Sequence, residues 1–206
     1  MAEYYYSTEP TSRHRRHQFT TVLRGREFTF QTDAGVFSRA HLDPGSKILI
    51  NRLELASCKA PLDLGCGYGA IGLVIAAELQ ETIVYMNDPN RRAVELARIN
   101  RDLNGIKNVR IEEGEDFTPW PQKSFDLIVT NPPLRAGKET VLRLFHQAAE
   151  RLTPGGALWV VIRTSQGAKS YAQALARIIG SVETKEIKSG YRVFKATKMS
   201  PASTEI

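Results

Sequence analysis

The feature of this sequence that most constrains its fold is a regular alternation of strand-like and helix-like segments after residue 60. Short apolar runs typical of strands are separated by longer stretches in which apolar residues recur with helical spacing. Strands are expected at residues 62–64, 82–86, 109–111, 125–130, 157–162, 182–187 and 191–197, and helices at 70–79, 89–103, 139–152 and 168–179. This alternation predicts an α/β fold in which helices cover both faces of a mostly parallel sheet.

The last third of the chain refines the expected sheet. Residues 157–162 form a continuous apolar run, as expected for a strand that is covered on both faces. The final two strands meet at Lys188-Ser189-Gly190, a sequence typical of a hairpin, so the last strand should run antiparallel to its partner. We therefore predict a Rossmann-like, doubly wound, seven-stranded sheet, mostly parallel with the last strand antiparallel.

The first 58 residues differ from the rest. Residues 11–26 contain five arginines and two histidines but no acid, and residues 27–33 alternate like a strand. After a break at Asp43-Pro44-Gly45-Ser46, residues 47–55 are expected to form a short helix. We interpret residues 1–58 as an extension packed on the core, with a basic arm, a β-hairpin and a short helix. Residues 59–198 form the main domain and residues 199–206 a flexible tail.

Composition narrows the class of protein. The 206 residues carry a net charge of +6, which is compatible with an anionic partner but does not establish one. Cys58 and Cys66 make neither a disulfide framework nor a zinc motif, so no metal is expected. The first residues lack the pattern of a signal peptide, and no apolar run approaches the ~18 residues of a membrane span. We expect a cytoplasmic protein without a membrane partner.

A glycine-rich loop, Asp63-Leu64-Gly65-Cys66-Gly67-Tyr68-Gly69, lies between the first expected strand and its helix. Glycine lets the backbone turn tightly and lets a ligand approach closely, and the helix that follows presents its N–H groups to the same place. The loop therefore indicates a nucleotide-like ligand, although Gly65-x-Gly67-x-x-Ala70 also fits a dinucleotide fingerprint. Asp88, after the second strand, is expected to bind ribose hydroxyls in either cofactor class and to cap the next helix, with Pro89 in its first turn.

A second motif, Asn131-Pro132-Pro133, follows the expected strand at 125–130. The two prolines stiffen the backbone and lack N–H groups, so the Asn131 side chain and the Pro132 carbonyl can project together. Two converging acceptors match the two hydrogens of an –NH2 group and would orient its lone pair towards an electrophile. An ordinary Asn-Pro turn is the alternative. The position at the end of a central strand, beside the glycine loop, favours a ligand site.

Together these motifs resemble those of class I S-adenosylmethionine-dependent methyltransferases that modify amino groups. The chain further resembles the small-subunit ribosomal RNA guanine-N2 methyltransferase family, in its catalytic half and its short single-domain members. The likeness covers residues 4–198 and rests on Tyr4-Tyr5-Tyr6-Ser7-x-x-Pro10, Asp33-Ala34-Gly35-Val36-Phe37-Ser38, the glycine loop, Asn131-Pro132-Pro133-Leu134-Arg135-Ala136-Gly137-Lys138 and Gln166-Gly167-Ala168. It identifies residues 59–198 as the methyltransferase domain. The larger ribosomal enzymes carry an additional N-terminal domain that this sequence does not contain.

The resemblance implies roles for individual residues. Asn131 and Pro132 would be catalytic, because they would hold the target amine. Asn131 would also bind the cofactor. S-adenosylmethionine would be bound by Asp63, Gly65, Cys66, Gly67, Tyr68 and Gly69 at its methionine part, by Asp88 at its ribose, and by Glu115 or Asp116 at its adenine. The substrate would meet Phe37, Pro133, Leu134, Arg135, Lys138, Arg15 and Arg16. Related enzymes acting on adenine or glutamine carry Tyr or Phe where Leu134 stands, which points away from those substrates.

RNA is the partner that these implications favour. Candidates to hold its backbone are Arg13, Arg15, Arg16, Arg24, Arg26, Arg135 and Lys138, with a solvated arm as the alternative for the arginine run. The hypothesis is methyl transfer to the N2 amine of a guanine, unpaired or flipped out, in small-subunit ribosomal RNA. The alternatives are a tRNA guanine-N2 methyltransferase, a protein N-methyltransferase, a non-catalytic RNA-binding protein and a nicotinamide-dependent oxidoreductase. The last would not explain Asn131-Pro132-Pro133.

Overall fold

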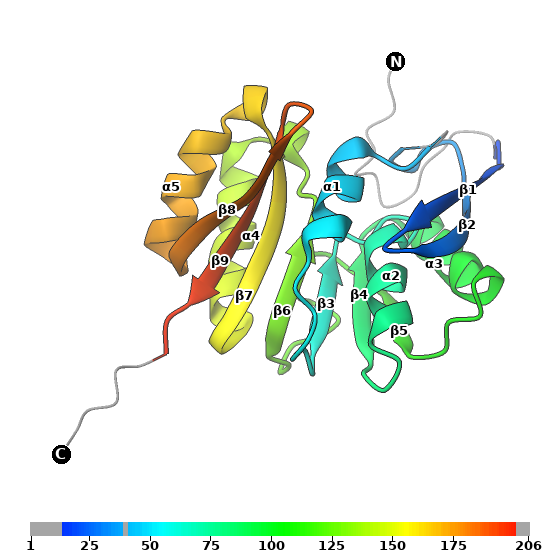
Figure 1. Cartoon of the computed structure of the whole chain (residues 1–206), viewed down its shortest axis with the longest axis horizontal. Coiled ribbons are helices and arrows are strands. Elements are labelled where there is room, and N and C mark those ends of the chain that lie inside the picture. The colour runs from blue at the N-terminus through cyan, green and yellow to red at the C-terminus, as the bar shows by residue number, and fades with distance from the viewer. Residues whose placement is uncertain (1–13, 39–40, 201–206) are drawn as a thin grey trace.

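The sheet at the centre of the molecule contains seven strands in the order β5-β4-β3-β6-β7-β9-β8 (Figure 1). The computed structural model describes residues 14–38 and 41–200. The strands are β3 (Pro61–Leu64), β4 (Val84–Asp88), β5 (Val109–Glu113), β6 (Phe125–Thr130), β7 (Leu152–Arg163), β8 (Gly180–Lys188) and β9 (Tyr191–Lys198). β9 lies between β7 and β8 and is antiparallel to both, while the other neighbouring pairs are parallel. The predicted doubly wound sheet with an antiparallel last strand is confirmed.

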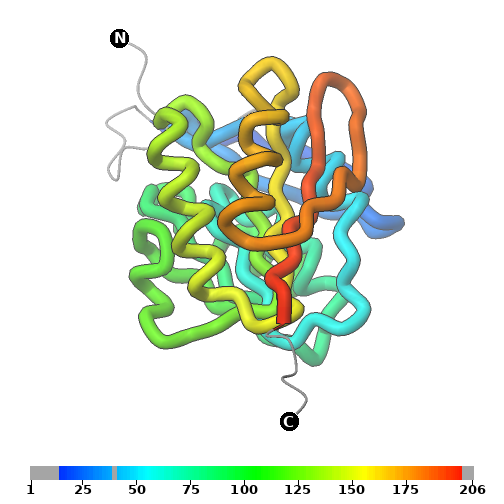
Figure 2. The backbone as a smooth tube through the Cα atoms, turned by 90° about the vertical axis from the view of Figure 1, so that its left-hand side faces the viewer, coloured from blue at the N-terminus to red at the C-terminus, as the bar shows by residue number. Residues whose placement is uncertain are grey.

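Within the described part of the chain, five helices cover the two faces of this sheet. They are α1 (Pro44–Arg52), α2 (Ala70–Glu78), α3 (Arg91–Leu103), α4 (Lys138–Arg151) and α5 (Ala168–Ile178). α1, α2 and α3 share one apolar core with Trp159 and Val161 of β7, and α4 and α5 share the other with Leu158 and Val160. Successive side chains of β7 thus point into opposite cores, which explains why its sequence is apolar without interruption. Figure 2 views the molecule from the side of α4 and α5. None of the helices in the described ranges has the length and apolarity that a membrane span requires.

Several expected boundaries differ from the observed ones, and three of the differences have an identifiable local reason. α1 begins at Pro44 because Asp43 caps it, accepting a hydrogen bond from the Ser46 N–H at 2.8 Å. α3 is capped by Asn90, not by Asp88, since the amide oxygen of Asn90 accepts the N–H groups of the first helical turn. β7 begins at Leu152 rather than at the expected residue 157, and the pairing of β6 with β7 changes register in this added part of the strand.

The N-terminal strands β1 (His17–Leu23) and β2 (Arg26–Thr32) form a separate antiparallel hairpin. One buried amide ties this hairpin to the core. Asn100 of α3 accepts the Gln31 N–H at 2.6 Å and donates to the carbonyls of Gln31 and Tyr68 at 2.9 and 2.8 Å. Phe28 and Phe30 of β2 belong to the same core as α2 and α3. We therefore propose that residues 1–58 act as an extension of the main domain rather than as an independent unit.

Replacing Asn100 with alanine is expected to lower the free energy of unfolding by about 2–4 kcal/mol. The substitution removes three hydrogen bonds and leaves the Gln31 N–H without its acceptor at a fully buried side chain. Urea denaturation followed by circular dichroism measures the change. The exposed Gln18 of the same hairpin provides the control, and Gln18→Ala should change stability by no more than about 0.5 kcal/mol. Equal effects of the two substitutions would contradict the account of how the hairpin is attached.

Candidate functional site

A cavity of about 340 Å³ opens at the carboxyl ends of β3, β4 and β6. The topology explains its position, because the ends of parallel strands meet at one edge of the sheet and the glycine loop leaves the backbone open there. Most of the residues predicted from the sequence line it: Phe37, Gly65, Cys66, Gly67, Tyr68, Asp88, Glu115, Asp116, Asn131, Pro132 and Pro133. Side chains from distant parts of the chain therefore meet in a single site.

The glycine loop forms one wall of the cavity. Gly65 and Gly67 have φ values of +72° and +57°, and a Cβ on either would meet no atom within 4 Å. These open positions leave room for a ligand against the backbone. The loop is anchored to β4, since the Gly67 N–H donates to Asp88 at 2.8 Å and the N–H groups of Gly65 and Cys66 donate to the Asn87 carbonyl.

Asp63 and Gly69 lie behind this wall rather than in it. Asp63 is fully buried, and its Oδ2 accepts the Gly72 N–H at 2.7 Å, which braces the loop against α2. Its other oxygen, Oδ1, has no partner among the described residues. Burial raises the pKa of Asp63 to about 7, and the negative charge of Asp88 adds to the rise against the lowering effect of the Gly72 N–H. Asp63 therefore leaves one buried acceptor that a ligand amine or a proton can satisfy.

Asp88 is the last residue of β4 and faces the cavity. Its two oxygens accept the N–H groups of Gly67 and Asn90 at 2.8 and 2.9 Å, and each oxygen keeps a further lone pair for a ligand hydroxyl. Burial raises the pKa of Asp88 to about 6, although these two hydrogen bonds oppose the shift. The carboxylate thus has a fixed orientation and titrates close to neutral pH.

The raised pKa of Asp88 predicts pH-dependent cofactor affinity. Protonation converts one acceptor oxygen into an O–H, so affinity for S-adenosylmethionine should fall as the pH drops from about 7 to about 5, by up to about tenfold. The loss follows the folded pKa of about 6 and fades over about one pH unit above it. Calorimetric titration across this range measures it. Asp88→Asn should bind more weakly near pH 7 and should lose the step near pH 6, and an unchanged step in that variant would assign it to another group.

Glu115 and Asp116 follow β5 on the far side of the cavity. Arg143 of α4 pairs with both carboxylates, at 3.0 Å to Glu115 and 3.3 Å to Asp116. Asn87 donates to the Asp116 carbonyl at 2.8 Å, which fixes the backbone of this loop. Burial raises the pKa of Asp116 against the opposing charge of Arg143, and Glu115 is exposed. Arg143 was not predicted from the sequence, because a single arginine on an amphipathic helix has no distinguishing pattern.

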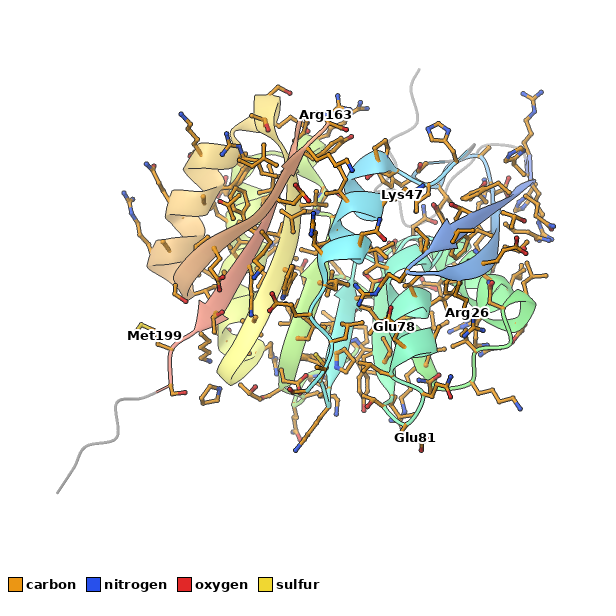
Figure 3. All side chains as sticks on the ribbon, viewed as in Figure 1. Arg26, Lys47, Glu78, Glu81, Arg163 and Met199 are labelled. Atoms are coloured by element: carbon orange, nitrogen blue, oxygen red, sulfur yellow. The ribbon has the colours of Figure 1, made fainter. Side chains whose placement is uncertain are left out.

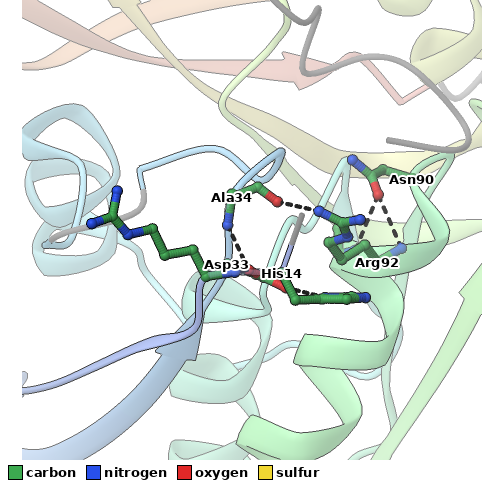
Figure 4. Close-up of polar contacts among 7 residues, drawn as sticks. His14, Asp33, Ala34, Asn90 and Arg92 are labelled. Carbon is green, nitrogen blue, oxygen red and sulfur yellow. Dashed lines mark hydrogen bonds and ion pairs between the residues drawn. The ribbon is translucent and has the colours of Figure 1, made fainter. Parts of the chain in front are cut away.

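The loop of residues 33–38 covers the cavity and is held by the contacts in Figure 4. The buried carboxylate of Asp33 accepts hydrogen bonds from Nδ1 of His14 and from the backbone N–H groups of Arg15 and Ala34. Burial alone would raise the pKa of Asp33, but these hydrogen bonds lower it below its usual value. Arg92 of α3 donates to the Ala34 carbonyl at 2.6 Å. Together these bonds hold Phe37, which is 45% exposed, at the edge of the cavity.

Asn131 lies at the end of β6, where Thr130 donates to the Leu64 carbonyl and so joins β6 to β3. The amide nitrogen of Asn131 donates to Asp43 Oδ2 and to Ser46 Oγ, both at 3.0 Å. Among the described residues no group donates to its amide oxygen. The sequence does not indicate Asp43 and Ser46 as site residues, because Asp-Pro-Gly-Ser is also typical of a break in the chain. Their proximity to Asn131 depends on the tertiary fold.

The backbone after Asn131 makes a tight turn. Pro133, with φ −73° and ψ 70°, allows the Leu134 N–H to donate to the Pro132 carbonyl at 2.8 Å, an inverse γ-turn. A carbonyl oxygen has two lone pairs, so the Pro132 carbonyl can still accept from a ligand. Both predicted acceptors, the Asn131 amide oxygen and this carbonyl, thus belong to residues that line the cavity.

Several predicted substrate contacts lie outside the cavity wall. Leu134 packs against the core under α4 and α5, Arg135 is exposed, and Lys138 donates to Ser170 at 2.8 Å. The side chains of Arg15 and Arg16 are exposed on the extension. The arm residues Tyr4, Tyr5, Tyr6 and Arg13 lie outside the described ranges.

Two arginines of the predicted basic arm have structural partners. Arg24 donates to the carbonyls of Ile50 and Leu53 and pairs with Glu78, so it attaches the hairpin to α1 and α2. The expectation that Arg24 is available to RNA is therefore wrong, because its guanidinium is occupied within the fold. Arg26 donates to the Asn104 carbonyl and lies over the Phe28 ring. In residues 14–38 and 41–200, no three His, Cys, Asp or Glu side chains group as metal ligands.

Relatives of this chain include ribosomal RNA methyltransferases. The uncharacterized Bacillus subtilis protein YbxB is 40% identical over 97% of this chain and 100% of its own length. Ribosomal RNA small subunit methyltransferase C of Pseudomonas aeruginosa is 30% identical over 88% of this chain and 54% of its own length. Ribosomal RNA large subunit methyltransferase G of Pseudoalteromonas translucida is 29% identical over 85% of this chain and 47% of its own length. The chain thus spans about half the length of these two ribosomal RNA relatives.

A solved structure has the same fold. A T. thermophilus 16S rRNA N2 methyltransferase, in complex with S-adenosylmethionine and guanosine, superimposes with a TM-score of 0.79 at 26% identity. The match covers 92% of this chain and 52% of that one.

The cofactor of this chain is S-adenosylmethionine, and the residues present fit it. The open faces of Gly65 and Gly67 leave space for a ligand, the unpartnered Asp63 Oδ1 provides a buried acceptor, and Asp88 presents a carboxylate to the cavity. The sequence profile described as methyltransferase small domain matches residues 27–195. This chain therefore belongs to the methyltransferase small domain family and is a class I S-adenosylmethionine-dependent methyltransferase.

Proposed function

We propose that this protein transfers a methyl group to the exocyclic N2 amine of a guanine in small-subunit ribosomal RNA. The observation that carries the proposal is the pair of acceptors at the end of β6. The Asn131 amide oxygen accepts from no described residue, and the Pro132 carbonyl beside it keeps a free lone pair. An –NH2 group has two hydrogens, and two adjacent acceptors bind both.

Binding both hydrogens has a chemical consequence. The guanine amine is a weak nucleophile because its lone pair is delocalised into the ring. Hydrogen bonds to Asn131 and to the Pro132 carbonyl favour a more tetrahedral nitrogen and direct its lone pair away from the two acceptors. Bound S-adenosylmethionine supplies an electrophilic methyl group. No strong base is needed before transfer, since the methylated nitrogen is acidic and releases its proton to solvent.

The form of the site supports a single flipped-out base as substrate. A base within a helix cannot enter a recessed cavity, so the guanine has to leave its stack. Phe37 lines the edge of the cavity and is 45% exposed, and aromatic side chains commonly contact unstacked bases. The ribosomal RNA methyltransferases among the relatives and the guanosine in the superimposed structure support the same choice.

Positive charge near the cavity supports an RNA partner. Figure 3 labels Lys47, which is exposed on α1, the helix that begins beside Asn131, and Arg163 at the end of β7. Arg135 and Lys138 follow the Asn131-Pro132-Pro133 motif in the chain and are exposed. Cations around the entrance would hold the phosphates that flank the flipped nucleotide. We propose these four residues, with Arg15 and Arg16 of the extension, as backbone contacts.

A label-transfer assay tests the substrate class. Purified protein and methyl-labelled S-adenosylmethionine are incubated separately with free small-subunit RNA, isolated small subunits, large-subunit RNA, tRNA and a protein extract. We expect label in small-subunit RNA, free or assembled. Label confined to large-subunit RNA or tRNA would correct the RNA class. Label found only in protein would show that RNA is not the substrate, and the proposal that the enzyme methylates an amine would still stand.

A further inference from the structure

We propose that Asp43 and Ser46, at the start of α1, are positioning residues that hold the Asn131 amide with its oxygen towards the substrate amine. The inference rests on the proposed function, because it concerns the same acceptor. The Asn131 nitrogen has two hydrogens, and each has an acceptor, Asp43 Oδ2 and Ser46 Oγ, both at 3.0 Å. Both N–H groups of the Asn131 amide therefore have acceptors within the protein.

The two ends of an amide differ in their chemistry, and Asp43 decides which end it contacts. A carboxylate only accepts hydrogen bonds, so it attracts the Asn131 N–H group. Turning the amide over would place its oxygen 3.0 Å from Asp43 Oδ2, where two acceptors would repel each other. The observed orientation is the one that leaves the Asn131 oxygen for a ligand. Without Asp43, the Ser46 hydroxyl alone could pair with either orientation, because it can accept from the amide nitrogen or donate to the amide oxygen.

Asp43 is itself held rigidly. The same Oδ2 atom that accepts from Asn131 also accepts the Ser46 N–H at 2.8 Å, as the N-cap of α1. The adjacent Gly45 lies against Tyr191 of β9, where a Cβ would come within 2.8 Å of the ring. Ser46 is buried, with 6% exposure. The start of α1 is thus fixed between Asn131 and β9, and its contacts with Asn131 restrict the rotation of the Asn131 side-chain amide.

The hydrogen bonds that the Asn131 amide nitrogen donates also affect how strongly the Asn131 amide oxygen accepts hydrogen bonds. Donation to a carboxylate polarises the amide, which strengthens its oxygen as an acceptor. The amine nitrogen becomes more positive as it receives the methyl group, so a stronger acceptor stabilises the transition state more than the ground state. Asp43 and Ser46 should therefore act on turnover and hardly on binding.

Three variants of Asp43 separate positioning from helix capping. Asp43→Asn can keep an oxygen for both the cap and the Asn131 nitrogen. Asp43→Ser keeps a cap, since serine is a good N-cap, but its shorter side chain falls short of Asn131. Asp43→Ala loses both. We expect kcat on small-subunit RNA to fall about 30- to 100-fold in Asp43→Ala and Asp43→Ser. Ser46→Ala should fall less than these two variants. Asp43→Asn keeps an acceptor oxygen but loses the charge, so its kcat should lie between those of the wild type and Asp43→Ser, with cofactor affinity and the KM for RNA nearly unchanged throughout.

A measurement without RNA tests the orientation directly. The side-chain NH2 signals of Asn131 are assigned by NMR from their loss in Asn131→Ala. We expect slow solvent exchange of both hydrogens in the wild type and in Asp43→Asn, and faster exchange with changed shifts in Asp43→Ser. Unchanged Asn131 signals in Asp43→Ser, or wild-type kcat in that variant, would overturn the inference. If the signals respond as expected but the wild type methylates no RNA, the proposed function fails and the orientation of the amide stands.

Discussion

Replacing Asn131 with alanine is expected to lower kcat about 100- to 1000-fold while leaving affinity for S-adenosylmethionine within a few-fold of wild type. The change removes an amide oxygen of the cavity that accepts from no described residue, and with it one of the two proposed acceptors for the amine. The Pro132 carbonyl remains, so a residual rate should persist. The glycine loop and Asp88 do not depend on Asn131, which is why cofactor binding should survive.

Single-turnover methyl transfer, combined with calorimetry for the cofactor, separates these two effects. Asn51 provides a matched control, because it is exposed on α1 and lies away from Asn131's hydrogen bonds. Asn51→Ala should behave as wild type in both measurements. Full activity of Asn131→Ala would eliminate the proposed mechanism. A loss of cofactor binding in proportion to the loss of rate would instead assign Asn131 to the cofactor.

Gly67→Val is expected to weaken S-adenosylmethionine binding by more than about 100-fold, while the protein still folds. Gly67 has a φ of +57°, and the space above its Cα is open and belongs to the cavity. A valine side chain would occupy that space. It would also add about 1–2 kcal/mol of strain, because a β-branched residue disfavours the left-handed region.

A valine at Gly105 serves as the control that distinguishes backbone strain from obstruction of the cofactor site. It follows α3 with a φ of +64°, and its Cβ position is also open, but it does not line the cavity. Gly105→Val should lower the melting temperature by a similar amount and bind the cofactor normally in calorimetry. Normal cofactor affinity in Gly67→Val would mean that the ligand does not approach the glycine loop. Equal loss of affinity in both variants would attribute the effect to stability alone.

Much of the fold follows from the sequence because its signals are local and repeated. The apolar run in β7 and the hairpin at Lys188-Ser189-Gly190 depend on neighbouring residues alone, and both predict the structure correctly. The glycine loop predicts the cavity for the same reason, since positive φ angles at Gly65 and Gly67 are a local property.

The errors arise where one local pattern has two structural outcomes. Asp-Pro-Gly-Ser fits a turn as well as a helix start, and only the packing of α1 against β9 decides for the helix. Asp88 and Asn90 are both good N-caps, and the choice falls on Asn90 because β4 continues through Asp88. Arg24 was grouped with a basic arm by charge, whereas its partners on α1 and α2 are distant in sequence. The Asp43–Asn131 contact joins positions 88 residues apart, so no local pattern indicates it.

The most direct test of the central claim is to identify the atom that receives the methyl group. Small-subunit RNA methylated by the wild-type protein is digested to nucleosides, and the product is identified by chromatography and mass spectrometry. The account predicts N2-methylguanosine, and it predicts at most a trace of this nucleoside from Asn131→Ala under the same conditions. A methyl group on a ribose hydroxyl or on a ring carbon would contradict it, because neither position has the two amine hydrogens that Asn131 and the Pro132 carbonyl are proposed to bind.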